Sequence, residues 1–268
     1  MIAHQTGENE AAVQLISNAI RINPHIAAYH MNLGTALKGL GRLDDAVSSY
    51  EKALAINPDF AEAHFNLGIT LKAQGRLDGA VSSYRNAITL RPDYATAHSN
   101  MGTALQELER LDDALASYRQ AIAVRPNYAE AHNNLGHVLK VQGRFEDAVS
   151  SYQSAIAVNP DFAEAHFSLG VALEDLGRPG DALASHRRAL ELDPNAAETH
   201  SALGNALQKL GRMEEALTSC RTAIEISPDY VDGHHNLGIA LLLMGRFEEG
   251  WEHFEWRKKI KIKPGTRL

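Results

Sequence analysis

The chain repeats itself every 34 residues, and this period restricts its fold more than any other feature. A proline recurs at this spacing in seven successive copies: Pro24, Pro58, Pro92, Pro126, Pro160, Pro194 and Pro228. A glycine recurs with the same period at Gly34, Gly68, Gly102, Gly136, Gly170, Gly204 and Gly238. A second glycine recurs at Gly7, Gly41, Gly75, Gly143, Gly177, Gly211 and Gly245, with Glu109 in one copy. A period of this length is typical of solenoids, in which each repeat packs only on its neighbours.

Each recurring position predicts a structural role. The proline lacks an N–H and ends the second helix of a pair. The second glycine suits a turn between two helices, where a left-handed backbone is needed. Gly34 and its copies, together with the small residues at Ala12, Ala46, Ala80, Ala114, Ala148, Ala182 and Ala216, allow two helices to approach closely. An aromatic residue fills the space that remains, at Tyr50, Tyr84, Tyr118 and Tyr152, then His186 and Cys220, and finally Phe254.

Four segments also predict where the first helix of a pair begins. In each, Asp or Asn is followed three residues later by Glu, at Asp59–Glu62, Asn127–Glu130, Asp161–Glu164 and Asn195–Glu198. This is the spacing of a capping box, in which the first residue caps the helix. The chain is therefore predicted to be an all-α solenoid of antiparallel helix pairs, near 27–40 and 44–57 and their copies. The pattern is identified as the tetratricopeptide repeat (TPR), which implies a right-handed superhelix.

The period divides residues 1–268 into a single solenoid. Residues 1–26 match the rear part of a repeat, with Gly7 at the turn position, and residues 27–230 form six complete repeats. The complete repeats are 27–60, 61–94, 95–128, 129–162, 163–196 and 197–230. Residues 231–258 form a degenerate last repeat, because Gly250 and Arg257 stand where alanines are expected. Residues 259–268 are a basic tail.

Composition indicates which classes of partner and which cellular compartment to expect. The net charge of −7 argues against nucleic acid as the main partner. The N-terminus has no basic and apolar signal segment, and the longest apolar run, Ile239 to Met244, is too short to cross a membrane. We therefore expect a cytoplasmic protein that does not enter membranes. Cys220 is the only cysteine, which excludes an internal disulfide.

No catalytic, cofactor or metal site is predicted. Seven histidines share the period, at His30, His64, His98, His132, His166, His200 and His234. Neighbouring helices pack about 8–10 Å apart, whereas zinc needs every ligand about 2.0–2.3 Å from one point, so packing and hydrogen bonding explain this row better. Cys220 replaces an aromatic core residue, which favours packing over nucleophilic chemistry. The chain also lacks a phosphate-binding glycine loop and the usual hydrolase motifs.

One row suggests a binding site. Two residues before the first glycine stand Asn32, Asn66, Asn100, Asn134 and Asn236, with Ser168 and Ala202 in the other two repeats. Asparagine is a poor helix former, but its amide both donates and accepts hydrogen bonds. In the TPR architecture this position faces the concave surface, where such amides would hold the backbone of an extended peptide. The alternative is that repeat duplication copied a tolerated residue.

The segment AEAHFNLG, with Asn66, and the following LKAQGRLDGAVSSY resemble the repeats of O-linked N-acetylglucosamine transferases. In that family, asparagines inside the superhelix hold protein substrates. The resemblance implies the same role for the five asparagines, and Ser168 and Ala202 depart from it. It leaves two interpretations: a non-catalytic scaffold for extended peptides, or the substrate-recruiting part of a glycosyltransferase whose catalytic domain lies outside this chain. The lack of lysine just before the asparagines argues against TPR proteins that clamp a carboxylate. Self-association through the apolar C-terminal repeat is a further expectation.

Overall fold

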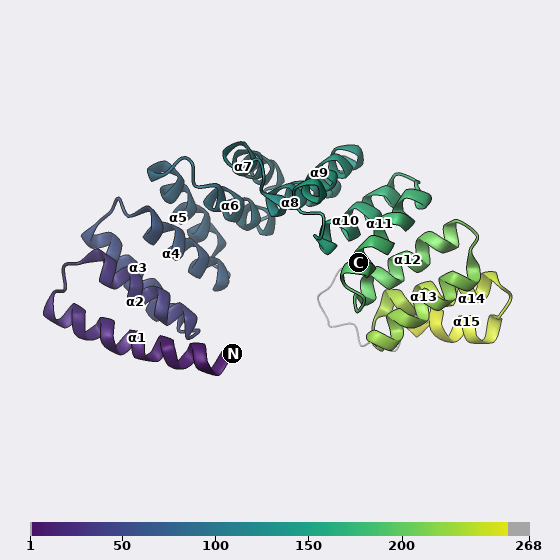
Figure 1. Ribbon diagram of the computed structural model, residues 1–268, viewed down its shortest axis with the longest axis horizontal. Coiled ribbons are helices and arrows are strands. Elements are labelled where there is room, and N and C mark those ends of the chain that lie inside the picture. Colours follow the sequence, from purple (N-terminus) through teal and green to yellow (C-terminus); the bar gives the residue numbers. More distant parts are fainter. Residues whose placement is uncertain (1, 257–268) are drawn as a thin grey trace. The chain divides into compact units, whose positions relative to one another are not determined.

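The computed structural model describes residues 2–256, and the side chains of residues 8–256, as an all-α structure (Figure 1). The described residues form fifteen helices that pack as antiparallel pairs, so the predicted fold class is confirmed. The chain divides into two compact units, Met1–Val138 and Leu139–Leu268, and the division falls within α8 (Ala129–Val141). The predicted basic tail at 259–268 lies outside the described residues.

In the first unit, the helices alternate with short turns in the predicted order. The helices before α8 are α1 (Ile2–Ile22), α2 (Ala27–Gly39), α3 (Leu43–Ile56), α4 (Ala61–Ala73), α5 (Leu77–Leu90), α6 (Ala95–Glu107) and α7 (Leu111–Val124). Each second helix ends two residues before its proline, which agrees with the predicted stop. In what is described of this unit, α4 contacts both α2 and α6, whereas α3, α5 and α7 do not contact one another. The first helices therefore lie on the inner side of this unit's bend.

The second unit repeats the same arrangement. Its helices are α9 (Phe145–Val158), α10 (Ala163–Asp175), α11 (Pro179–Leu192), α12 (Ala197–Lys209), α13 (Met213–Ile226), α14 (Val231–Leu243) and α15 (Phe247–Phe254). Helix α12 contacts both α10 and α14, whereas the described second helices of this unit do not contact one another. The first helices thus line the inner side of this unit as well, and α10, α12 and α14 can act together as one surface.

The first glycine row is required by the aromatic row. A Cβ atom on Gly68 would lie 2.7 Å from ring atoms of Tyr84, and one on Gly102 would lie 2.8 Å from Cε1 of Tyr118. Such distances are shorter than real Cβ contacts, so alanine at these positions would displace the ring. Both tyrosines are completely buried. The ring of the second helix therefore packs directly on the backbone of the first helix, which explains why both positions keep the same period.

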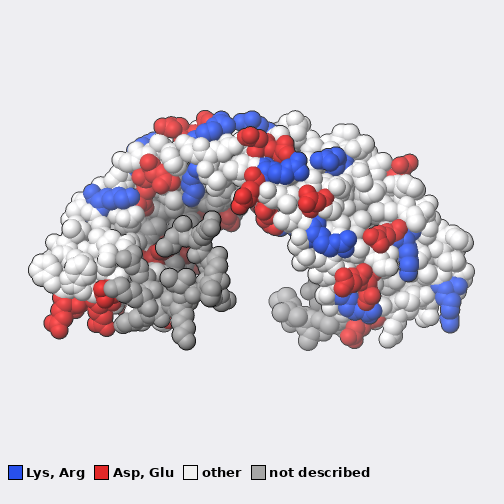
Figure 2. Space-filling view, turned by 180° about the vertical axis from the view of Figure 1, so that it is seen from behind, with Lys and Arg blue, Asp and Glu red and all other residues white. Residues whose placement is uncertain are grey.

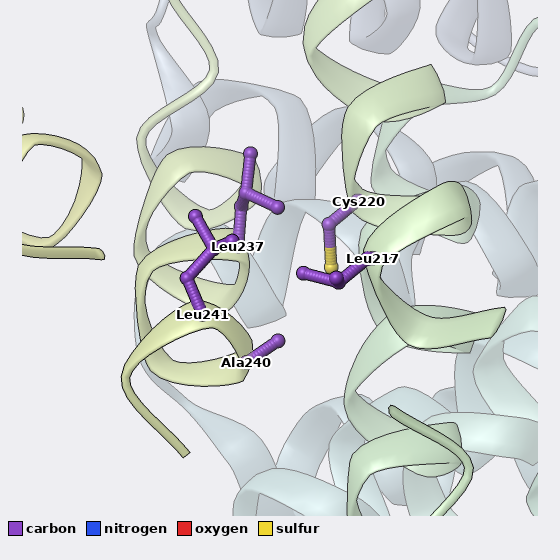
Figure 3. Close-up of a cluster of buried hydrophobic side chains, with 5 residues drawn as sticks. All are labelled: Leu217, Cys220, Leu237, Ala240 and Leu241. Atoms are coloured by element: carbon purple, nitrogen blue, oxygen red, sulfur yellow. The ribbon is translucent and has the colours of Figure 1, made fainter. Parts of the chain in front are cut away.

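Cys220 takes the place of the ring in the sixth complete repeat. It packs in a cluster with Leu217, Leu237, Ala240 and Leu241 from α13 and α14 (Figure 3). Burial raises the pKa of the Cys220 thiol to about 12. Because the thiolate is the reactive form, a thiol with this pKa is inert near neutral pH. The prediction that Cys220 is a packing residue is confirmed.

Three of the four predicted capping boxes, those before α4, α10 and α12, are wrong. Helix α4 begins at Ala61 and its N-cap residue is Phe60, which makes no side-chain capping bond. Instead, the side chain of the Asp or Asn before the proline accepts a hydrogen bond from the backbone N–H two residues later. These bonds run from Asp59 N to Asn57 Oδ1 (3.2 Å), from Asp161 N to Asn159 Oδ1 (3.3 Å) and from Asn195 N to Asp193 Oδ1 (3.2 Å). This local turn competes with helix formation and moves the N-cap of α4 by one residue, from Asp59 to Phe60.

The turn glycines behave as predicted except at two places. Six of them have φ between 69° and 75°, and Glu109 adopts the same left-handed conformation with φ of 59°. Gly7, by contrast, lies inside the continuous helix α1, so the turn expected there is not formed. Helix α1 packs on α2, and no first helix precedes it within the described residues. Within the described residues, a turn at Gly7 would therefore have no preceding helix to fold back on.

Candidate functional site

The histidine row is structural. In all seven copies Nε2 lies 2.9 or 3.0 Å from the carbonyl oxygen of the proline six residues earlier. Because a carbonyl only accepts, Nε2 carries the proton and donates. Each histidine thus ties its first helix to the turn that precedes it. This confirms the prediction of hydrogen bonding, and the described residues contain no group of three or more side chains arranged to hold a metal ion.

Arginines at the second-helix starts are paired locally. Each of six arginines forms an ion pair with the acidic residue three positions later: Arg42, Arg110, Arg144, Arg178, Arg212 and Arg246. On the face shown in Figure 2, acidic and basic side chains accordingly lie beside one another in small groups. Nucleic-acid binding relies on basic side chains that are free to contact phosphates. The local pairing supports the expectation that nucleic acid is not the partner.

The predicted asparagines of the first unit lie on its first helices. Asn32 on α2 is exposed, and Asn66 on α4, Asn100 on α6 and Asn134 on α8 are partly buried. Asn100 lines a cavity of about 320 Å³ between α4 and α6, beside Ile69 and Thr103. Among the described residues, the side chains of Asn32, Asn66 and Asn134 have no hydrogen-bond partner. These three amides can therefore bind a ligand without breaking a protein contact.

Asn236 lies in a different environment in the second unit. Its Nδ2 donates to Oγ of the buried Ser201 over 2.9 Å, which links α14 to α12. Both residues line a cavity of about 280 Å³ on the inner side of this unit. The cavity is lined by Phe167, Val171, Glu174 and Asp175 of α10, by Glu198, Ser201, Ala202, Asn205 and Lys209 of α12, and by Tyr230, Asp232 and Asn236 at α14. Asn236 is thus held in place, unlike Asn32 or Asn66.

Glu174 organises one end of this cavity. Its Oε1 accepts from Nε2 of the buried His186 (3.0 Å), and its Oε2 accepts from Asn205 Nδ2 (2.6 Å) and Lys209 Nζ (2.8 Å). Burial alone would raise the pKa of Glu174, but the hydrogen bonds from His186 and Lys209 outweigh it and hold the pKa below its ordinary value. Glu174 and Lys209 therefore neutralise each other at this end.

The other end of the cavity is negatively charged. Glu198 and Asp232 stand in the first turns of α12 and α14, and both are exposed. Burial, together with the negative charges of Asp232 and Glu198, raises the pKa of Tyr230 to about 12, although a hydrogen bond with Ser201 opposes this shift. Both carboxylates thus lie close enough to Tyr230 to act on its hydroxyl. From its sequence position Glu198 is predicted to serve helix capping, whereas Tyr230 and Asp232 have no predicted role.

Two further expectations concern surfaces. No helix of the described residues is both long and apolar enough to cross a membrane. On the C-terminal repeat, Leu243, Phe247 and Trp251 expose large apolar side chains. Trp251 occupies the position of Val47, Val81 and Leu115, which are buried in earlier repeats. Self-association through this face stays a prediction.

Solved structures similar to this chain share its fold. One chain of the Cut9–Hcn1 hetero-tetramer of the APC/C matches with a TM-score of 0.68 and 20% identity, over 89% of this chain and 47% of its own. This chain thus spans about half the length of that relative. YrrB, a TPR protein with an unusual peptide-binding site, matches with a TM-score of 0.59 and 23% identity, over 69% of this chain and 95% of its own. PilF of Pseudomonas aeruginosa matches with a TM-score of 0.66 and 20% identity, over 77% and 93%.

Sequence comparison agrees with the fold. No curated protein matches the chain. The family described as "TPR repeat" matches residues 36–75, 70–109 and 106–143, and that described as "Tetratricopeptide repeat" matches 134–197, 197–230 and 219–252. These matches together run from residue 36 to residue 252, which is more than half of the chain. Solenoids of this kind are typically non-catalytic scaffolds that bind protein or peptide partners, and this chain belongs to the tetratricopeptide-repeat family.

Proposed function

We propose that this chain is a non-catalytic scaffold that binds extended peptide segments along the inner face of its first helices. The observation that carries this proposal is the row of amides on that face. Asn32, Asn66 and Asn134 recur once per repeat, are at least partly exposed, and have no hydrogen-bond partner within the described part of the chain. A row of such amides can donate to and accept from a peptide backbone while ignoring its side chains.

The cost of the row supports a role beyond folding. Asparagine is less favourable than alanine inside a helix, and within the described residues these side chains form no hydrogen bond that would offset that cost. Each hydrogen bond to a peptide contributes a net ~0.5–1.5 kcal/mol. Ordering the peptide reduces the total, so we expect micromolar or weaker affinity and broad sequence tolerance. Asn236 differs, because Ser201 already engages its Nδ2. In its repeat only the amide oxygen would face a ligand.

The test begins with a random 12-residue peptide library displayed on phage and selected on the full chain. The affinity of an enriched peptide is then compared between the parent chain, the Asn32→Ala/Asn66→Ala variant and the Asn86→Ala/Gln120→Ala control. Asn86 and Gln120 are exposed amides on the second helices α5 and α7. Loss of two hydrogen bonds, together about 1–3 kcal/mol, should weaken binding roughly 5- to 150-fold in the first variant only.

Backbone recognition has its own signature. N-methylation of the peptide's backbone amides should weaken binding more than alanine substitution of its side chains, and this difference should shrink in the Asn32→Ala/Asn66→Ala variant. The fold of that variant should hold or become slightly more stable, since alanine is the better helix former. Enrichment of no peptide would contradict the scaffold proposal. Unchanged affinity in the correctly folded variant would contradict the role of the asparagines.

A second candidate is the substrate-recruiting part of a protein glycosyltransferase. The likeness of AEAHFNLG and its Asn66 to O-GlcNAc transferase repeats favours it. A glycosyltransferase domain in the same reading frame would support this candidate, and a frame without one would exclude it. In either case the isolated chain should neither hydrolyse a sugar nucleotide nor transfer its sugar to a peptide. Turnover that is lost on a point mutation within the chain would overturn the non-catalytic assignment.

A further inference from the structure

In one repeat of the first unit, an arginine side chain lies between an aromatic ring and a carboxylate, and we call this arrangement the complete site. The guanidinium of Arg91 lies over the ring of Tyr94, with its carbon 4.8 Å from the ring centroid, and it pairs with the carboxylate of Glu62. Phe65 packs on the same tyrosine, with ring centroids 4.6 Å apart. Carboxylate and aromatic ring thus hold one arginine side chain between them, by charge and by cation–π attraction.

The cation–ring contact recurs one repeat later. Arg125 lies over the ring of Tyr128, with its carbon 4.9 Å from the centroid. Arginine three residues before this tyrosine therefore reaches the ring in two successive repeats. The geometry follows from the turn around the proline, which returns the arginine over the tyrosine at the start of the next helix. The same turn recurs at Pro228, so an arginine at the equivalent position there would reach the equivalent ring.

Four repeats after the complete site, the second unit keeps the ring and the carboxylate but not the cation. Glu198 and Tyr230 stand at the positions of Glu62 and Tyr94, whereas Ser227 replaces the arginine. Ser201 replaces the phenylalanine that packs on the ring in the first unit. Both replacements remove a large side chain beside Tyr230. The cavity of about 280 Å³ described above lies at this place, lined by Glu198, Ser201 and Tyr230.

Among the described residues, nothing balances the charges at this end of the cavity. Asp232 adds a second carboxylate beside Glu198, and neither has a hydrogen-bond or ion-pair partner among the described residues. Among the described residues that line the cavity, Lys209 is the one cation, and it pairs with Glu174 at the other end. Ser201, which is buried, binds Asn236 and lies near the hydroxyl of Tyr230. The ring of Tyr230 thus lies on a wall that the contact between Ser201 and Asn236 fixes, and the two carboxylates beside it can turn toward a ligand.

We propose that this cavity binds an arginine side chain supplied by an extended segment of another protein. The guanidinium takes the place that Arg91 occupies in the first unit, over the ring of Tyr230 and beside Glu198 and Asp232. This inference deepens the proposed scaffold function, on which it rests, by naming a side chain that the second unit selects. Asn236, which lines the same cavity, would contact the backbone of the segment, and the cavity would fix the position of the segment on the inner side of this unit.

The test uses the full chain and a small probe, so that it does not depend on peptide binding. Nα-acetyl-arginine methylamide is titrated while backbone amide shifts are followed by NMR, and the citrulline analogue, which is nearly isosteric and uncharged, is the matched ligand. The arginine probe should shift amides near Glu198, Ser201, Tyr230 and Asp232 in a saturable way. The citrulline probe should bind at least about tenfold more weakly, because it loses charge-assisted bonds and the cation–π contact.

Three variants complete the test. Glu198→Gln/Asp232→Asn should weaken binding of the arginine probe at least tenfold. The control Asp229→Asn, which changes an exposed carboxylate outside the cavity, should leave this affinity unchanged. Ser227→Arg should supply the missing cation from within the chain and block the probe. Equal shifts from both probes, or unchanged binding in Glu198→Gln/Asp232→Asn or Ser227→Arg, would overturn the inference. Arginine binding here without any enriched library peptide would leave this cavity as an arginine site and contradict only the scaffold proposal.

Discussion

Glu109 occupies a backbone conformation that glycine adopts in every comparable turn. Its φ is 59°, and the six turn glycines at Gly41, Gly75, Gly143, Gly177, Gly211 and Gly245 have φ from 69° to 75°. A Cβ built on any of those six glycines meets no atom within 4 Å, so this position faces open space. Glu109 itself is exposed, and no side-chain contact is given up when it is removed. Glu109→Gly should therefore relieve strain without a packing cost.

The magnitude follows from three contributions. The left-handed conformation costs a residue with a Cβ roughly 1–2 kcal/mol. Glycine reduces this gain in stability by about 0.4–1 kcal/mol, because it raises the conformational entropy of the unfolded chain. Removing a negative charge near the C-terminus of α6 (Ala95–Glu107) adds roughly 0.3 kcal/mol, since a helix C-terminus favours cations. The net gain should be about 1 kcal/mol, or a roughly fivefold change in the ratio of folded to unfolded protein.

The free energy of unfolding is measured by urea titration and far-UV circular dichroism on the parent chain and three variants. Glu109→Gly should gain about 1 kcal/mol, whereas Glu109→Gln, which keeps the Cβ, should gain only the small charge contribution. Gly75→Glu, the reciprocal change at an equivalent turn, should lose about as much as Glu109→Gly gains. The reasoning is refuted if Glu109→Gly destabilises the chain, or if Glu109→Gln stabilises it equally.

Two further predictions concern the core. Ala114 is completely buried on α7, so Ala114→Leu should lower the free energy of unfolding by about 1–3 kcal/mol in urea titration. Ala116 on the same helix is exposed, so Ala116→Leu should be nearly neutral. Equal stability of the two variants would contradict this prediction. Because burial raises the pKa of Cys220 to about 12, its thiol stays protonated near pH 8, and iodoacetamide should label it only as fast as the chain unfolds; labelling of the folded chain at the rate of a free thiol would be evidence against it.

The sequence predicted the helix pairs correctly but not the residues that cap the first helices. The period places a proline after every second helix, and the structure ends each such helix two residues earlier. The capping boxes failed because two local patterns compete around the proline. The side-chain oxygen of Asn57 accepts a hydrogen bond from the backbone N–H of Asp59. Asp59, which was expected to cap the helix, is therefore part of the turn instead. Spacing alone does not decide which of two local hydrogen bonds forms.

The site was predicted in part. The position of the asparagines on the first helices follows from the period, as does the structural role of the histidines, each six residues after a proline. The cavity beside Tyr230 was missed, although the sequence holds its signal. Where the second repeat has Phe65 and Arg91, the sixth has Ser201 and Ser227. Two large side chains lost at matching positions of one repeat indicate an opening, provided that the two positions are known to meet.

The sequence by itself determined the unit of this protein: two helices, a turn and a proline stop, repeated because the same spacing recurs in several independent rows. These properties depend on residues near one another in the chain, so a period reveals them. The tertiary structure decided which carboxylates are neutralised and where the cavity opens. Glu174 meets Lys209 from the next repeat, and Tyr230 lies beside Ser201 from the previous helix pair. Such contacts depend on distance in space between helices, and they differ between repeats whose local sequences predict the same fold.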